Sequence, residues 1–221
     1  HFLQLLRGAG IEIGALHRPC DAPHLKGSFV DRMTVAELRA QYPELRSAPI
    51  VETDKIDDAE TLATFADKSQ DFVIANHVIE HMGNPIRALA NWERVLRVGG
   101  RLFLAAPDMH FTFDRERAKT SIEHLVLDFE HPDPKRDREH FEEFARLVSC
   151  RQFKLKPEDQ YRELAQELWD KQYSIHYHVW DYASFQEFLQ YLAGSEGWRF
   201  KRVAERATAG DEFIFVLERR T

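Results

Sequence analysis

The chain has 221 residues, of which 43% are hydrophobic, and this is enough for a single domain with a sizeable buried core. Its 37 Asp and Glu residues outnumber its 30 Lys and Arg residues, and the net charge of −7 argues against a nucleic-acid-binding protein. No apolar run approaches the roughly 20 residues that a membrane-spanning helix needs. The two cysteines, Cys20 and Cys150, cannot form a disulfide framework, and the first residues show no signal-peptide pattern, so we expect a cytoplasmic protein.

The first third of the chain alternates short apolar runs with loops. Residues 15–26 contain two prolines and no helical period, which predicts a loop. Thr34 begins a predicted helix that runs to about Tyr42, because Glu37 completes a capping box three residues later. A short helix is expected over residues 59–65. The predicted strands of this part are Ile11–Gly14, Ser28–Asp31, Ile50–Thr53 and Asp71–Ala75.

The clearest helix signal in the chain follows these strands. Asn84 is a suitable N-cap, Pro85 stands at the first helical position, and apolar residues then recur at helical spacing as far as Leu96. Residues 108–180 are charged, rich in histidine and mostly helical, with helices expected near 138–149 and 157–171. The remaining elements are a strand at Arg101–Ala106, a helix at Asp181–Leu192 and a closing hairpin of strands at 198–206 and 211–218.

This order of elements predicts an α/β fold. Strands that alternate with helices form a mostly parallel sheet, and the closing hairpin makes the last strand antiparallel. We therefore expect a Rossmann-like sheet of seven strands, within a single domain that covers residues 1–221. Residues 108–180 are expected to form a helical insert, or cap, between the fifth and sixth strands.

Polar residues and a glycine follow several of the predicted strands. In open α/β sheets, ligands bind outside the carboxyl ends of the strands. Gly14 follows the first strand and allows close approach of the backbone to a ligand. Asp31 ends the second strand, where a carboxylate accepts hydrogen bonds from the hydroxyls of a ribose. The other residues at these ends are Asp54, Asn76, His77 and Asp108.

The most specific motif lies between Asp71 and Asp108. A strand that begins with Asp71 is followed by His77-Val78-Ile79-Glu80-His81, a helix, Leu96-Arg97-Val98-Gly99-Gly100 and another strand. This block resembles the class I S-adenosylmethionine-dependent methyltransferases of the methyltransferase type 11 group. The resemblance covers residues 10–108 and leaves residues 108–180 outside the shared motifs.

The resemblance implies S-adenosylmethionine as cofactor and gives roles to residues at the strand ends. Glu12 and Gly14 match the glycine motif of the family, Asp31 matches its ribose-binding acid, and Asp54 matches its adenine-side acid. Asn76 and His77 would flank the methyl donor. These six residues are the cofactor-binding residues that we predict.

Two departures from the family pattern concern the region after the first strand. Only Gly14 remains at the first turn, where the family has two or three glycines, and the helix that usually joins the first two strands is replaced by a loop. A nicotinamide-dependent oxidoreductase on the same kind of sheet is disfavoured, because the chain lacks Gly-x-Gly-x-x-Gly and carries the block that begins at Asp71. The reduced glycine motif leaves a second alternative, a degenerate methyltransferase-like partner subunit that binds the cofactor without catalysis.

Histidines of the insert are the predicted catalytic residues. A neutral imidazole is a suitable base near pH 7 if the acceptor is a hydroxyl. We expect one of His140, His176 and His178 to reach the transferred methyl, although these residues could instead cap helices and join the insert to the sheet. If residues 176–178 are extended, His176 and His178 share a face. A zinc site is disfavoured, since both cysteines are isolated and no long helix carries paired histidines beside an acid.

The expected function is therefore that of an enzyme, an S-adenosylmethionine-dependent methyltransferase. The acceptor is expected to be a small molecule or a glycan-type compound, because the insert would cover it. Neither a nucleic acid nor a membrane is an expected partner. The sulfonium of the donor is already activated, so the protein would mainly align donor and acceptor and exclude water.

Overall fold

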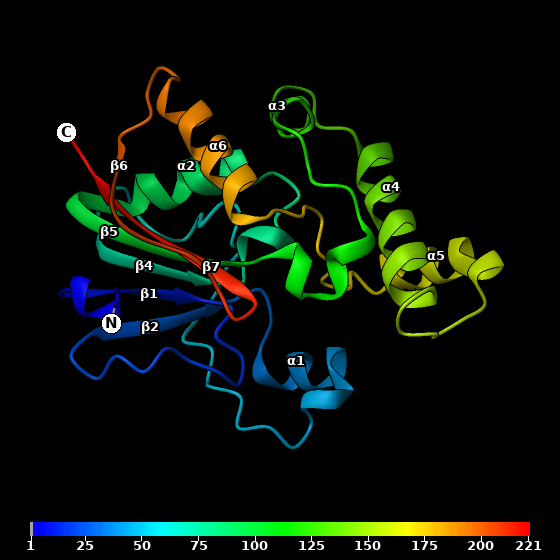
Figure 1. The fold of residues 1–221 in the computed structure, drawn as a ribbon. Coiled ribbons are helices and arrows are strands. Elements are labelled where there is room, and N and C mark those ends of the chain that lie inside the picture. Colours follow the sequence, from blue (N-terminus) through cyan, green and yellow to red (C-terminus); the bar gives the residue numbers. More distant parts are fainter. Residues whose placement is uncertain (1) are drawn as a thin grey trace.

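The computed structural model describes residues 2–221, which fold around one seven-stranded sheet of order β3-β2-β1-β4-β5-β7-β6 (Figure 1). Strands β1 to β5 pair in parallel, and β7 runs antiparallel to both β5 and β6. This confirms the predicted fold class, including the antiparallel last strand. The strands are β1 (Ala9–Ile13), β2 (Lys26–Asp31), β3 (Lys55–Ile56), β4 (Gln70–Asn76), β5 (Leu96–Pro107), β6 (Phe200–Ala209) and β7 (Glu212–Arg219).

Within residues 2–221, six α-helices accompany the sheet. Figure 1 shows α2 and α6 on one face of the sheet, while α3, α4 and α5 form a group beyond the ends of β1 and β4. Among residues 2–221, no helix is long and apolar enough to cross a membrane. The helices are α1 (Val35–Gln41), α2 (Pro85–Val95), α3 (Ile122–Glu130), α4 (Pro134–Phe144), α5 (Tyr161–Asp170) and α6 (Tyr182–Ala193).

The two faces of the sheet are covered differently. Trp92 of α2 and Phe188 of α6 belong to the core on the first face, and both side chains are fully buried. On the second face, Phe72 and Phe103 pack against Leu6 and against side chains of the loop after β1. That loop contains no helix in residues 14–25, as predicted, so loops and a short 3-10 helix (Phe2–Leu5) cover this side.

Helix ends follow the predicted capping residues. Thr34 caps α1 in a capping box with Glu37, and Asn84 caps α2 by accepting a hydrogen bond from the backbone N–H of Arg87 at 2.9 Å. Asp181 caps α6 through the N–H of Ser184. A side chain that satisfies a free N–H at a helix start contributes about 1 kcal/mol, which explains why these signals place the helices so well.

Two elements in the first third of the chain were predicted wrongly. The third strand is Lys55–Ile56, not Ile50–Thr53. Ile50 is buried, and the N–H of Val51 donates to the carbonyl of Leu16 in the loop after β1 instead of to a neighbouring strand. Residues 59–65 form turns rather than a short helix. Their carbonyls accept hydrogen bonds from the side chains of Trp92 and Arg94, so they are not available to a helical ladder.

Residues 108–180 contain helices α3, α4 and α5, whose bounds differ from those expected. Helix α3 has no counterpart among the helices predicted, and α4 begins at Pro134 and continues through a π-helical turn (Ala145–Cys150). The insert has its own apolar cluster, in which Phe141 and Phe144 of α4 pack with Leu164 of α5. It returns to α6 through residues 171–181, which pass over the carboxyl ends of the parallel strands.

A tight backbone contact in the central strands gives a test of this packing. An added Cβ at Gly10 would clash with the carbonyl oxygen of Phe72 and lie 2.7 Å from its Cγ, whereas a Cβ at Gly27 would come no closer than 3.8 Å to the same ring. We expect Gly10→Ala to lower the free energy of unfolding by about 1–3 kcal/mol, because β1 and β4 must separate. Gly27→Ala is the control and should leave it nearly unchanged. Denaturant unfolding measures both, and equal effects would contradict this account.

Candidate functional site

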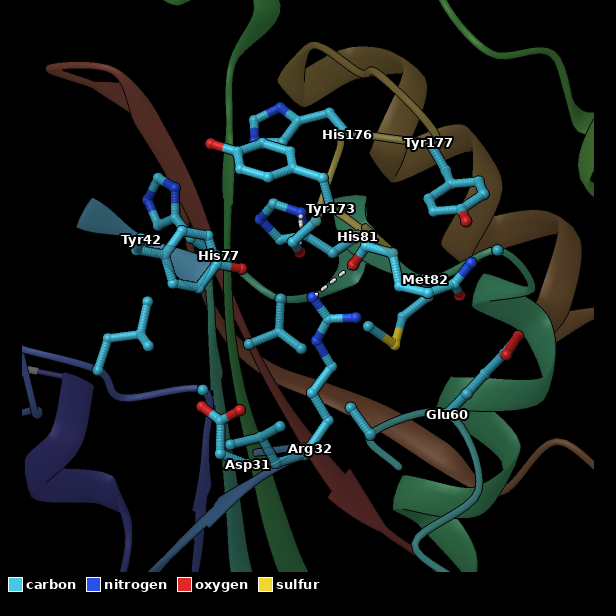
Figure 2. A pocket seen from close by; sticks show the side chains of 18 of the residues that line it. Asp31, Arg32, Tyr42, Glu60, His77, His81, Met82, Tyr173, His176 and Tyr177 are labelled. Atoms are coloured by element: carbon cyan, nitrogen blue, oxygen red, sulfur yellow. Dashed lines mark hydrogen bonds between the residues drawn. The ribbon is translucent and has the colours of Figure 1, made fainter. Parts of the chain in front are cut away.

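A cavity of about 610 Å³ lies between the carboxyl ends of the parallel strands and the insert. The sheet contributes Gly14, Asp31 and His77 to its lining, and the insert contributes His176 and Tyr177. Figure 2 shows Asp31 on the sheet side of this space and His176 across from it. The cavity therefore brings together residues that are far apart in the sequence, at the sheet edge where the strand-end argument places a ligand.

Gly14 directly follows β1, and Asp31 is the last residue of the adjacent strand β2. Gly14 has φ of +64°, a conformation that favours glycine, and its N–H donates to the carbonyl of Val30 at 2.9 Å. Burial raises the pKa of Asp31 although backbone N–H groups of Arg32 and Met33 favour its ionised form. Asp31 thus presents a half-buried carboxylate to the cavity, and no side chain of residues 2–221 forms a hydrogen bond with it.

Arg32 joins this sheet edge to the insert. Its guanidinium donates a hydrogen bond of 2.8 Å to the carbonyl of Gln172. Gln41 of α1 makes two weaker contacts of 3.3 Å to the carbonyls of Lys171 and Gln172. The polypeptide after β2 and the end of the insert therefore meet across the mouth of the cavity.

An acidic run after β3 was missed by the sequence reasoning. Asp57 and Glu60 line the cavity, and burial raises the pKa of Glu60 to about 7. The Oε1 atom of Glu60 is buried and has no hydrogen-bond partner within the described residues 2–221. Asp54, which we predicted at this position, does not line the cavity; its carboxylate accepts a hydrogen bond from the N–H of Phe29 at 2.8 Å. Correct placement of β3 would have pointed to the run Asp57–Glu60.

His77 occupies an unusual backbone position directly after β4. Its φ is +54°, and its imidazole Nε2 lies 3.0 Å from Glu212 while Nδ1 lies 3.6 Å from the buried carboxylate of Glu80. Burial disfavours the charged imidazole, but the hydrogen bond with Glu212 and the charges of Glu80 and Glu212 outweigh it, so the pKa of His77 is raised. A strained histidine that favours its cationic form thus stands at the cavity wall.

His176 is held by a buried ionic network. Its Nδ1 lies 2.6 Å from Asp114, whose other carboxylate oxygen accepts a hydrogen bond of 3.0 Å from Arg117. Burial alone would raise the pKa of Asp114, but the hydrogen bond with His176 and the charge of Arg117 hold it below its usual range. Arg117 also donates to the backbone carbonyl of His176 at 2.8 Å. An ionised Asp114 that accepts the Nδ1–H leaves Nε2 as the nitrogen with a free lone pair.

The structure separates the other predicted residues from the cavity lining. Glu12 is buried in β1 and accepts a hydrogen bond from the N–H of Cys20 at 2.9 Å, and Asn76 is the last residue of β4. His140 and His178 lie behind the wall in a second cluster. Of the three predicted catalytic histidines, His176 alone lines the cavity, and the catalytic roles of His140 and His178 stay predictions.

Comparison with known proteins finds one matching family and solved structures with a similar fold. A family described as "Methyltransferase domain" matches residues 8–104. No curated protein sequence matches the chain. A putative methyltransferase of Haloferax volcanii, solved in complex with the Trm112 methyltransferase activator, is 13% identical, with a TM-score of 0.51 over 98% of this chain and 85% of that one. At such identity this likeness shows the fold alone.

Two further solved structures are similar to this chain. A protein described as a putative zinc-dependent alcohol dehydrogenase of Rhodobacter sphaeroides is 12% identical, with a TM-score of 0.56 over 98% of this chain and 86% of that one. The CurJ carbon methyltransferase is 15% identical, with a TM-score of 0.48 over 97% of this chain. The chain spans 49% of the length of that CurJ structure.

The contact between His77 and Glu212 gives a prediction with a defined sign. Replacing Glu212 by Gln removes the negative charge beside His77 and leaves at most a neutral hydrogen-bond partner, so NMR titration of the His77 imidazole should show a lower pKa. Because the folded-state pKa is raised, the contact stabilises the fold fully below the unfolded value of about 6.5, and this contribution is lost as the pH rises through the folded-state pKa. Glu218→Gln, on the same strand but paired with Arg101, is the control. An unchanged His77 titration in Glu212→Gln would refute the assignment.

Proposed function

We propose that the chain is a class I S-adenosylmethionine-dependent methyltransferase and that it methylates a hydroxyl of a small-molecule or glycan-type acceptor. One observation carries this proposal. The carboxylate at the end of β2, Asp31, and the histidine oriented by Asp114, His176, line the same cavity from opposite sides (Figure 2). The first is suited to hold the donor and the second to deprotonate an acceptor.

The cavity residues fit S-adenosylmethionine. The volume of the cavity, about 610 Å³, lies within the range of ligand sites in proteins, about 300–1,000 Å³. Asp31 would accept hydrogen bonds from the ribose hydroxyls, and Gly14 keeps the end of β1 clear, since an added Cβ there would meet only Val78 at 3.5 Å. Glu60, with a buried oxygen that has no partner, stands where an adenine amino group could donate.

The acceptor half of the cavity belongs to the insert. Phe113, Tyr173 and Tyr177 form an apolar and aromatic wall beside His176. Such a wall binds the flat or apolar face of an acceptor and excludes water from the reacting atoms. This arrangement supports an acceptor of small-molecule size rather than a macromolecular surface, because the insert covers the site.

The reaction is an in-line displacement at the methyl carbon of the sulfonium. The acceptor oxygen forms the new bond to that carbon, the carbon–sulfur bond breaks, and the acceptor proton passes to Nε2 of His176. Asp114 fixes the tautomer in which Nε2 accepts a proton and stabilises the imidazolium that forms, because its carboxylate stays ionised against Arg117. Donor activation requires no further group, so alignment and proton removal are the contributions of the protein.

We expect Asp31→Ala to weaken binding of both S-adenosylmethionine and S-adenosylhomocysteine. Loss of a charged acceptor for two ribose hydroxyls should cost about 1.5–3 kcal/mol, which is roughly a tenfold to hundredfold loss of affinity. Titration calorimetry measures it, with Asp21→Ala, on the exposed loop after β1, as the control. Unchanged affinity in Asp31→Ala would overturn the ribose assignment, and absence of binding to the unaltered chain would overturn the proposed function.

We expect His176→Gln to lower turnover by about 10²–10⁴ while leaving affinity for the donor intact, because general base catalysis is worth about that much. A substrate for this assay is identified by incubating isotope-labelled donor with a panel of hydroxylated acceptors. Mass spectrometry then detects the acceptor that has gained the labelled methyl group. His24→Gln, on an exposed loop, is the matched control. Near-normal turnover in His176→Gln would remove the base from the mechanism. Donor binding without transfer to any acceptor of the panel would favour the non-catalytic alternative.

A further inference from the structure

Four side chains of the insert converge in a cluster that the proposed function does not use. His124 and Asp128 lie one turn apart on α3, His140 comes from α4, and His178 comes from the segment that follows α5. One nitrogen or oxygen atom from each of the four lies within 4.8 Å of the others. His124 and His178 are 54 positions apart in the sequence, so only the fold of the insert brings the four residues together.

The distances suit a small cation. The Nε2 of His124 lies 3.1 Å from Oδ2 of Asp128 and 3.2 Å from Nε2 of His140. The same carboxylate oxygen of Asp128 lies 3.9 Å from Nε2 of His140 and 4.0 Å from Nε2 of His178. A tetrahedral zinc ion with bonds of about 2.0–2.1 Å holds its ligand atoms about 3.3 Å apart. Small side-chain movements would therefore bring all four atoms to bonding distance.

The cluster is buried, and some of its polar atoms lack partners. The side chains of Asp128, His140 and His178 are at most 9% exposed. Among residues 2–221, Nδ1 of His178 has no hydrogen-bond partner, and the nearest polar neighbour of Oδ2 of Asp128 in the cluster is the imidazole nitrogen of His124 at 3.1 Å. An unpaired buried polar atom costs about 1–3 kcal/mol, so three imidazoles and a carboxylate facing one another are poorly satisfied by themselves. A cation at their centre would accept a lone pair from each ligand.

Neighbouring groups hold the ligands in place. Arg136 donates to the other carboxylate oxygen of Asp128 at 2.5 Å, so Oδ2 is left to point into the cluster. His140 also hydrogen-bonds the backbone of Tyr177. Ligation would replace two contacts, that of His178 Nε2 with the carbonyl of Gly83, which is long at 3.3 Å, and that of His124 Nε2 with His140 Nε2 at 3.2 Å. Such supporting contacts are typical of protein metal sites.

We propose that His124, Asp128, His140 and His178 bind one divalent transition-metal ion, with zinc as the ion that best fits the ligand set. Three imidazoles and one carboxylate supply a full tetrahedral set with no open position, which is the pattern of a structural zinc site. The ion would join α3, α4 and the segment after α5, next to the wall of the cavity that Tyr177 lines. The inference is independent of the proposed methyl transfer.

The first experiment measures metal content and stability of the whole chain. Chelator-treated protein is incubated with zinc chloride, freed of excess metal and analysed by mass spectrometry for elements. We expect one zinc per chain, a higher thermal unfolding midpoint than in the chelated protein, and an absorption spectrum of four-coordinate cobalt when Co²⁺ replaces zinc. Substoichiometric zinc with no change in the unfolding midpoint would overturn the proposal.

The second experiment locates the ion. His124 is the most exposed ligand, with 34% of its side chain accessible, so His124→Gln carries the least risk to folding. It should weaken zinc binding at least about tenfold, since loss of supporting groups alone costs that much. His124→Cys should restore binding and add a cobalt–thiolate absorption band. Another group of possible ligands, Glu80, His81 and His176, serves as the comparison. Loss of binding in His81→Gln but not in His124→Gln would place the ion there and refute the proposal.

Discussion

The carbonyl oxygen of Glu80 fixes the position of the insert over the sheet. It accepts hydrogen bonds from the N–H groups of Tyr177 and His178 at 2.7 and 3.3 Å, and so ties the segment after α5 to the turn that follows β4. A second tie joins the N–H of Met109 to the carbonyl of Trp180 at 2.9 Å. Because these are backbone contacts, they set the register of the segment whatever its side chains are. The placement of His176 at the cavity depends on that register.

The buried charged residues around Arg117 fix the positions of neighbouring groups more than they stabilise the fold. Arg117 and Asp114 each have only 1% of the side chain exposed, and Glu143 pairs with the guanidinium at 2.8 Å. Desolvation offsets much of the attraction within such a network, so it contributes little net stability. Its geometric effect is large, since the same guanidinium also donates to the carbonyls of His176 and Tyr177. The network therefore orients both the ring of His176 and the backbone that carries it.

The sheet could be predicted from the sequence because its strands are buried runs that end in recognisable turns, and because Asn84 and Thr34 cap their helices locally. The third strand could not, since Lys55 and Ile56 are exposed at the sheet edge and give no burial pattern. The sheet side of the cavity was predictable from local sequence too, because Gly14 directly follows β1 and Asp31 ends β2. The other half depends on tertiary contacts, such as that between Asp114 and His176, which no sequence period reveals.

The alternation of His176 and His178 shows where local reasoning stops. In an isolated strand two such residues share a face, but residues 173–179 pair with no neighbouring strand. Their hydrogen bonds run instead to Glu80, Arg117 and Thr120, which lie in different parts of the fold. His176 consequently packs beside Phe113 at the cavity, while His178 packs among the histidines of α3 and α4. One irregular segment thus contributes a histidine to the cavity and another to the histidine cluster of the insert. The hydrogen bond from Arg32 to Gln172, at the start of this segment, joins it to the carboxyl end of β2.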